Sequence, residues 1–230
     1  MLAIDCATLC GGAAIVDHRG VLAEHVLRSR SSHSVRILAT VDALLQETGL
    51  KLRDLGGIAV TRGPGSFTGV RVGISTAKGL AFADGLPLIG ISSLEALAWR
   101  CSPGDRLICP VIDARRHEIF AAGFRQSGDT HPELKIIISE QVNSIGAFLQ
   151  NIEAPAVFLG DGAQKYRQTI EERLGSRAAF AHLDKMLPSP SAVAGLGLQK
   201  FMRGEADSPA GVVPVYLRDA DAKKVAATIL

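Results

Sequence analysis

The sequence predicts a two-lobed α/β protein in which each lobe is a mixed sheet with helices packed on it. In the first half, three short strand-like segments follow one another and then alternate with helical segments. A looser copy of this order begins near residue 105. With 230 residues, 47% of them apolar, the chain can bury a core in each lobe. We expect an N-terminal lobe over residues 1–104 and a smaller C-terminal lobe over residues 105–230.

The first half opens as an antiparallel meander, because tight turns separate three short segments with strand-like composition. The spacing of apolar residues then changes to every three or four positions, which predicts an amphipathic helix that Gly49 ends and that Ser32 or Ser34 can cap. The expected elements are strands at 2–5, 13–17 and 21–28, a helix at 34–48, a strand at 57–61, a helix at 68–83, a strand at 87–91, and a short helix capped by Ser92 or Ser93.

The second half repeats this plan with less regular patterns. A charged turn, Asp113-Ala114-Arg115-Arg116-His117-Glu118, joins its first two strand-like segments. The tail is expected to form a short strand and an extended end. The other expected elements are strands at 106–113, 117–124, 133–139 and 156–161, and helices at 143–151, 163–174 and 190–203.

A glycine-rich loop, GPGSFTGVRVG at 63–73, lies between a predicted strand and a predicted helix. A phosphate-binding P-loop needs Gly-Lys-Ser/Thr after its second glycine, but Val70 and Arg71 follow Gly69 here. The Gly-x-Gly-x-x-Gly dinucleotide fingerprint also fails. The glycines are therefore interpreted as residues that make a tight turn and let the helix lie close to its neighbours.

The overall composition excludes several classes of function. The formal charge of +2 gives no electrostatic footprint for nucleic acid. The first residues have no basic start typical of a secretory signal, and no run reaches the roughly 18 apolar residues of a membrane span. The spacing of the four cysteines matches no zinc site, so reduced, mostly buried thiols are expected. We expect a cytoplasmic protein that does not bind membranes.

Longer motifs carry a family resemblance. They are AIDCAT near the start, the continuous stretch from His33 to Ala98 that contains RGPGSFTGVRVG, then DARRHEIFAA, and finally PVYLRD. In these motifs the chain resembles the TsaB family, also called YeaZ, over most of its length. The resemblance implies a two-lobed actin/Hsp70-like fold of the ASKHA, ribonuclease H-like class.

The resemblance also implies a function. Members of this family are non-catalytic relatives of the transferase TsaD in the formation of threonylcarbamoyladenosine (t6A) at adenosine 37 of tRNAs that read codons beginning with adenine. The resemblance implies that this chain binds and supports TsaD, that the ATPase TsaE joins them, and that tRNA is reached only through the complex. A homodimer is expected when TsaD is absent.

The motif in which TsaD-like proteins hold a metal ion is altered in this chain. Those proteins carry His-Leu-Glu-Gly-His, in which two histidines four residues apart share one helix face. Here Ser93 and Leu97 stand at the two ligand positions, and none of the six histidines forms another helical pair. We therefore expect no catalytic residue, no metal site and no cofactor.

Two predicted helices form the expected partner face. Their apolar stripes are broad, and the second contains small residues at four-residue spacing that allow another backbone to approach. An alternative is that both stripes only cover the sheet. The expected interface residues are Ile37, Leu38, Val41, Leu44, Leu45, Ser66, Phe67, Gly69, Val70, Gly73, Ile74 and Ala77.

Other interpretations remain open. Asp113, Arg115, Arg116 and Glu118 form either a solvated hairpin tip or a polar contact to nucleotide, TsaE or tRNA. Asp5 either caps a turn or holds a magnesium-bound water. The rival functions are a metal-dependent glycoprotease-like peptidase, a sugar-kinase-like ATPase, and a direct tRNA-binding module.

Overall fold

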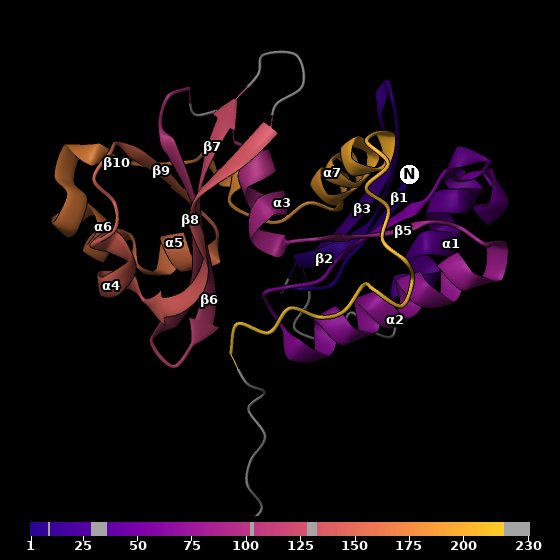
Figure 1. The fold of residues 1–230 in the computed structure, drawn as a ribbon, viewed down its shortest axis with the longest axis horizontal. Coiled ribbons are helices and arrows are strands. Elements are labelled where there is room, and N and C mark those ends of the chain that lie inside the picture. The colour runs from indigo at the N-terminus through magenta and orange to yellow at the C-terminus, as the bar shows by residue number, and fades with distance from the viewer. Residues whose placement is uncertain (9, 29–35, 102–103, 128–132, 219–230) are drawn as a thin grey trace, which may run out of the picture.

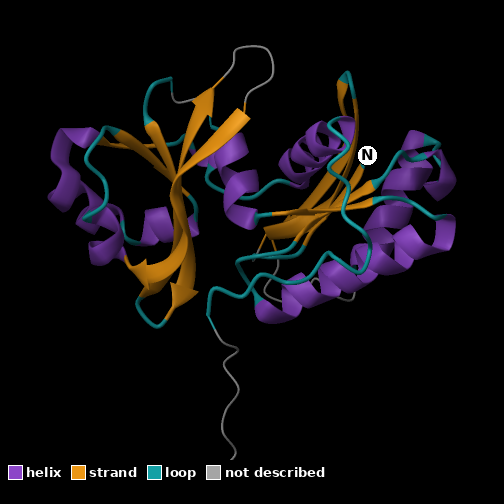
Figure 2. Ribbon diagram, in the orientation of Figure 1, coloured by secondary structure: helices purple, strands orange, loops and turns teal. Residues whose placement is uncertain are grey.

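Two five-stranded sheets lie side by side in a computed structural model of the chain (Figure 1). The structure describes residues 1–8, 10–28, 36–101, 104–127 and 133–218. Figure 2 shows that helices lie on both faces of the first sheet and that a further helix lies between the sheets. The predicted two-lobed α/β architecture is confirmed.

The first sheet has the strand order β3-β2-β1-β4-β5. Its first three strands form the predicted antiparallel meander, and β4 and β5 add to β1 in parallel. Strands β1, β4 and β5 are buried along their whole length, as their continuous apolar sequences require. The strands are β1 (Leu2–Asp5), β2 (Cys10–Asp17), β3 (Gly20–Arg28), β4 (Ile58–Thr61) and β5 (Leu88–Ile91).

The second sheet, β10-β9-β6-β7-β8, repeats the topology of the first. Counted along the chain, both sheets have their strands in the order third, second, first, fourth, fifth. In both, the first three are antiparallel and the last two are parallel to the first. The expected repeat of the two halves is therefore present. The strands are β6 (Leu107–Arg115), β7 (Glu118–Ser127), β8 (Glu133–Ser144), β9 (Ala156–Leu159) and β10 (Ala178–Phe180).

Helices α1 (Ile37–Thr48) and α2 (Phe67–Asp84) cover one face of the first sheet. Gly49 ends α1 in the left-handed conformation, as predicted, with φ 68°. The expected N-terminal caps of α1, Ser32 and Ser34, lie outside the described residues. Ser66 caps α2 by accepting a hydrogen bond from the Gly69 amide at 3.3 Å.

Two further helices each pack on the sheet of the other half of the chain. Helix α7 (Pro190–Met202) packs on the opposite face of the first sheet, against Ala3, Ala59 and Ile89. Helix α3 (Ser93–Trp99), capped by Ser92, packs its leucines on the second sheet. The described strands before residue 104 belong to the first sheet and the later ones to the second, whereas α3 and α7 each pack on the sheet of the other half.

The other face of the second sheet is covered by three short helices, whose Phe148, Ala163 and Ile170 are buried with Phe158 of β9. The helices are α4 (Ile145–Leu149), α5 (Asp161–Lys165) and α6 (Arg167–Leu174). Three 3₁₀ turns, η2 (Leu52–Asp54), η3 (Gly175–Arg177) and η4 (Leu183–Lys185), complete the described elements.

Several local expectations were wrong, and one short strand, β10, was not predicted. Strand β2 begins at Cys10, before the predicted 13–17, and its Gly12 lies so close to β3 that an added Cβ would be 1.9 Å from the His25 carbonyl oxygen. Strand β8 extends to Ser144, where helix 143–151 was expected to have begun. Strand β10 has three residues, too few for a pattern. The short strand expected in the tail is absent from its described part, residues 212–218, and residues 219–230 lie outside the described residues.

Candidate functional site

The glycine-rich loop packs against the turn between β1 and β2. A Cβ added at Gly65 would lie 2.2 Å from the Ala7 carbonyl oxygen, and one at Gly69 would lie 2.0 Å from that of Cys6. The Ser66 amide donates a hydrogen bond to the Ala7 oxygen at 2.6 Å. These positions have no room for a side chain, so the loop serves close packing, as the sequence analysis inferred.

Most of the expected interface residues lie beneath α1 and α2 rather than on the outer surface. They are packed in one core cluster with Leu2, Ile4 and Val60 of the sheet. This burial corresponds to the alternative that the stripes cover the sheet. The buried members are Ile37, Val41, Leu44, Val70, Gly73, Ile74 and Ala77.

The exposed part of the two helices is a different set of residues. Leu38 is 59% exposed on α1, and Leu45 is half-buried beside it. On α2, Phe82 is 89% exposed although it is a large apolar residue. Phe82 was not among the predicted interface residues, although the spacing of buried residues along α2 places it next to the buried stripe rather than within it.

The outward face of α2 is formed by small residues. Ser75, Gly79 and Ala83 are exposed, and they recur at four-residue spacing along the helix. A Cβ added at Gly79 would meet no atom within 4 Å. Because small side chains let another backbone come close, this face suits the approach of a second helix.

The first turn of α2 is partly covered by the C-terminal segment. The ring of Tyr216 stacks on that of Phe67 with 4.7 Å between centroids, and the Tyr216 hydroxyl accepts a hydrogen bond from Arg71 Nε at 2.7 Å. Phe67 and Gly69 are half-buried, while Ser66 is exposed. Of the expected interface, the part that a partner can contact directly is Leu38, Leu45 and Ser66, with Phe67 at its border.

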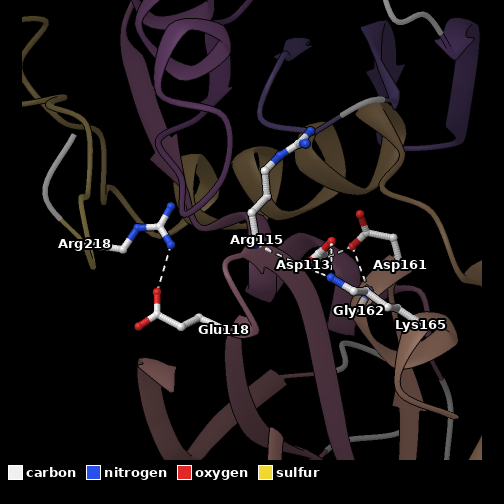
Figure 3. Close-up of polar contacts among 7 residues, drawn as sticks. All are labelled: Asp113, Arg115, Glu118, Asp161, Gly162, Lys165 and Arg218. Atoms are coloured by element: carbon white, nitrogen blue, oxygen red, sulfur yellow. Dashed lines mark hydrogen bonds and ion pairs between the residues drawn. The ribbon is translucent and has the colours of Figure 1, made fainter. Parts of the chain in front are cut away.

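The charged turn of the second lobe forms two separate polar contacts (Figure 3). Lys165 Nζ lies 2.9 Å from both Asp113 oxygens, and Arg218 pairs with Glu118 at 2.8 Å. The Asp113 carboxylate also accepts the Arg115 amide at 3.0 Å. The Arg115 side chain points away from both contacts in Figure 3. This geometry fits a hairpin tip in which Asp113 bonds a backbone amide of the turn.

The backbone of this turn is left-handed at three successive non-glycine residues. Arg115, Arg116 and His117 have φ values of 62°, 52° and 64°. Arg116 and His117 are the two central residues of a tight hairpin turn, where positive φ matches the strand twist. Such angles are unfavourable for residues with a Cβ. The register of β6 against β7 shifts between Asp113 and Arg115, so β6 contains one residue more than β7 at this point.

A small cavity lies between the lobes, close to this turn. Its volume of about 30 Å³ leaves room for little more than ordered water. Asp161 borders it, and burial raises the pKa of this carboxyl even though its Oδ1 accepts the amides of Asp113 and Gly162. The lining residues are Thr8, Cys10, Leu97, Ile112, Gly160, Asp161, Leu187 and Pro188.

Asp5, at the end of β1, is 1% exposed, and its carboxylate is hydrogen-bonded to neighbouring groups of the protein. Its Oδ1 accepts hydrogen bonds from the Ala7 amide at 3.0 Å and from the Thr61 hydroxyl at 2.9 Å. These contacts are those of a turn cap, one of the two roles that the sequence left open.

At the two positions where TsaD-like proteins carry histidines, this chain has residues that are buried in the core. Ser93 is 1% exposed, and Leu97 is fully buried against the second sheet. The described residues contain no group of three or more His, Cys, Asp or Glu that could hold a metal ion. The Ser93 hydroxyl has no hydrogen-bond partner among the described residues. These two side chains offer no metal-binding pair.

Comparison with known sequences decides the family. The family described as "TsaD: tRNA N6-adenosine threonylcarbamoyltransferase" matches residues 18–226. A Bacillus subtilis protein named "tRNA threonylcarbamoyladenosine biosynthesis protein TsaB" is 34% identical over 97% of this chain and 96% of its own length. The chain belongs to the TsaB family. The Escherichia coli TsaB is 33% identical over 95% of this chain and 94% of its own length.

Solved structures agree with this assignment. The structure titled "YeaZ from Pseudomonas aeruginosa" has a TM-score of 0.77 and 30% identity, and covers 94% of this chain and 98% of its own. The ethanolamine utilization protein EutJ from Carboxydothermus hydrogenoformans has a TM-score of 0.51 at 12% identity, covering 85% of this chain and 89% of its own. The latter likeness concerns the fold alone, which is the two-lobed actin/Hsp70-like one.

No helix in the described parts of the chain has both the length and the apolar character needed to cross a membrane.

Proposed function

We propose that this TsaB-family chain acts in threonylcarbamoyladenosine biosynthesis as a non-catalytic scaffold for a TsaD-like transferase. The relatives that it matches over nearly their whole length are named for this pathway. Ser93 and Leu97 are buried in the core and supply no metal ligands. The chain therefore contributes through contact with another subunit, and the transferase carries the chemistry.

The observation that carries this proposal is the exposed face of α1 and α2. It combines a large exposed apolar residue on each helix, Leu38 and Phe82, with the small outward residues Ser75, Gly79 and Ala83. Exposed apolar area beside a surface that admits close helix approach is typical of an interface between subunits. A TsaD-like transferase shares the family of this chain, so the same helices can pair across a pseudo-twofold axis.

We propose three further partners, one of which uses the same face. A second copy of this chain can occupy the face when the transferase is absent, which gives a homodimer. A TsaE-like ATPase joins the heterodimer, and tRNA is bound through the assembled complex. The near-neutral formal charge of +2 is consistent with tRNA contacts supplied mainly by the partner.

A reconstituted reaction tests this function. Purified TsaD-like transferase, TsaE-like ATPase, threonylcarbamoyl-adenylate and unmodified tRNA are combined with or without this chain, and modified adenosine is measured. The proposal expects modification only when the chain is present, and none from the chain alone. Modification at the same rate without it, or by it unaided, would overturn the scaffold role.

A further inference from the structure

Residues 207–218, the strap, run from the first sheet past α2 to the second lobe (Figure 1). At its start, Asp207 bridges to Leu88, and its Oδ2 accepts a hydrogen bond from the Gly90 amide at 2.9 Å. Val212 is 2% exposed and belongs to the core of the first lobe. This first part of the strap covers the open edge of β5, which would otherwise present unpaired backbone groups.

The middle of the strap is anchored on the first turn of α2. The Val215 amide donates to the Arg62 carbonyl oxygen at 2.7 Å, and Tyr216 stacks on Phe67. Arg71 holds both rings, because its guanidinium lies 3.9 Å from the Phe67 centroid while its Nε donates to the Tyr216 hydroxyl. Stacking, cation–π attraction and a hydrogen bond thus fix one side chain of the strap on the first lobe.

The end of the strap contacts the second lobe. Leu217 packs, partly buried, against the cluster that joins Leu97 of α3 to Ile112 of β6. Arg218 Nη1 then donates to Glu118 Oε2 at 2.8 Å, at the first residue of β7. Within three residues, therefore, the strap passes from an anchor on one lobe to an ion pair on the other.

We propose that the strap is a latch that holds the two lobes at the separation seen here. Tyr216 is its anchor on α2 and Arg218 its hook on β7. The hook is a partly exposed ion pair, with 24% exposure at Arg218 and 40% at Glu118, so it is weak enough to open while both cores stay folded.

A distance measurement between the lobes tests the latch. Spin labels are placed on cysteines introduced at the exposed residues Gln46 of α1 and Gln168 of α6. The native cysteines are buried, so labelling is confined to the introduced ones. Pulsed electron paramagnetic resonance then gives the distance distribution in the full chain and in the variants Tyr216→Ala and Arg218→Gln. Val213→Ala, at a strap residue that is 55% exposed, is the matched control.

The latch predicts one narrow distribution in the parent and in Val213→Ala. It predicts that Tyr216→Ala and Arg218→Gln each add a longer-distance population of about a tenth of the molecules or more. Circular dichroism checks that the variants are folded. Unchanged distributions in both variants overturn the proposal. If Tyr216→Ala does not fold, Arg218→Gln decides alone, because it alters only a partly exposed side chain.

Discussion

Two glycines of α2, Gly69 and Gly79, differ in the space around them, so we predict opposite effects on stability when each is replaced by alanine. At Gly69 a Cβ would lie 2.0 Å from a carbonyl oxygen of the neighbouring turn, whereas at Gly79 it would meet nothing within 4 Å. We expect Gly69→Ala to lower the free energy of unfolding by about 1–3 kcal/mol or more, because the backbone must move. Gly79→Ala should raise it by up to about 1 kcal/mol.

Urea unfolding of the two variants measures this difference. The substitutions are chemically identical and lie on the same helix, so each is the control for the other. Equal stabilities would mean that the loop does not pack against the β1–β2 turn as described.

The left-handed residues of the hairpin tip give a second prediction. His117 is exposed and has φ 64°, an angle that glycine adopts without steric cost. We expect His117→Gly to stabilise the protein by about 1 kcal/mol, with an upward shift of the thermal midpoint. Lys78→Gly, in the regular interior of α2, is the control and should destabilise by a similar amount. If His117→Gly were less stable than the parent, the imidazole ring would contribute more stability through its contacts than the left-handed backbone of His117 costs.

The cysteines give a prediction about reactivity. All four are buried, and burial raises the pKa of the Cys6 thiol to about 12 and also raises that of Cys109. Because the thiolate is the reactive form, the native protein should not react with a disulfide reagent near neutral pH. Spectrophotometric titration should detect thiols only after unfolding. Fast labelling of the native protein would contradict this burial.

At the scale of elements, the contact between β8 and the start of α3 predicts a dependence on pH. Burial raises the pKa of Glu140, whereas the Ser92 hydroxyl, Arg62 and Lys200 oppose the shift and Glu95 adds to it. The folded protein therefore binds this proton more tightly than the unfolded chain. Stability should fall as pH rises from the usual glutamate range to the raised value, and should then level off.

Glu140→Gln isolates this effect, because glutamine keeps a hydrogen-bonding group and does not titrate. Unfolding by urea at several pH values between about 4 and 7 should show a smaller decrease with rising pH in the variant than in the parent. Asp161, whose pKa is also raised, keeps its own contribution in both proteins, so only the difference is interpreted. If the free energy of unfolding depended on pH identically in both proteins, the raised pKa of Glu140 would be contradicted.

How well each element could be predicted depended on its contacts. Helices α1 and α2 were predictable because their apolar spacing is a local signal, as is Gly49 at the end of α1. Strand β2 begins earlier than predicted because Cys10 and the following glycines have little strand propensity, and pairing with β3 decides their conformation. Short β10 is held by its pairing with β9 and by the packing of Phe180 on the core, and neither contact leaves a local sequence signal.

The candidate site was less predictable than the fold. A linear pattern shows that Val70 and Ile74 share a stripe with Ala77, but not whether that stripe faces the sheet or a partner. The structure places it against the sheet and leaves Leu38 and Phe82 outside. Nor could spacing in the sequence show that Tyr216 covers Phe67, a contact between residues far apart in the chain.

At the scale of the whole molecule, two copies of one topology are joined by helices that each pack on the other half's sheet. Helix α3 follows β5 but packs on the second sheet, and α7 follows the second sheet but packs on the first. This arrangement leaves α1 and α2 as a helical layer on one face of the first sheet, and Leu38, Gly79 and Phe82 of this layer are exposed. Such a layer suits docking to a subunit of the same fold.

The central claim is that the outer face of α1 and α2 binds a TsaD-like transferase. Gly79→Arg places a long charged side chain on that face, at an exposed position with no neighbour within 4 Å, so the fold should be retained. Gln168→Arg adds the same side chain at an exposed position on α6 and is the control. Calorimetric titration with the transferase measures the affinity of both variants and of the parent.

We predict that Gly79→Arg lowers the affinity at least about tenfold, equivalent to about 1.4 kcal/mol, while Gln168→Arg leaves it unchanged. Parent-like affinity in a folded Gly79→Arg variant would contradict the proposed interface.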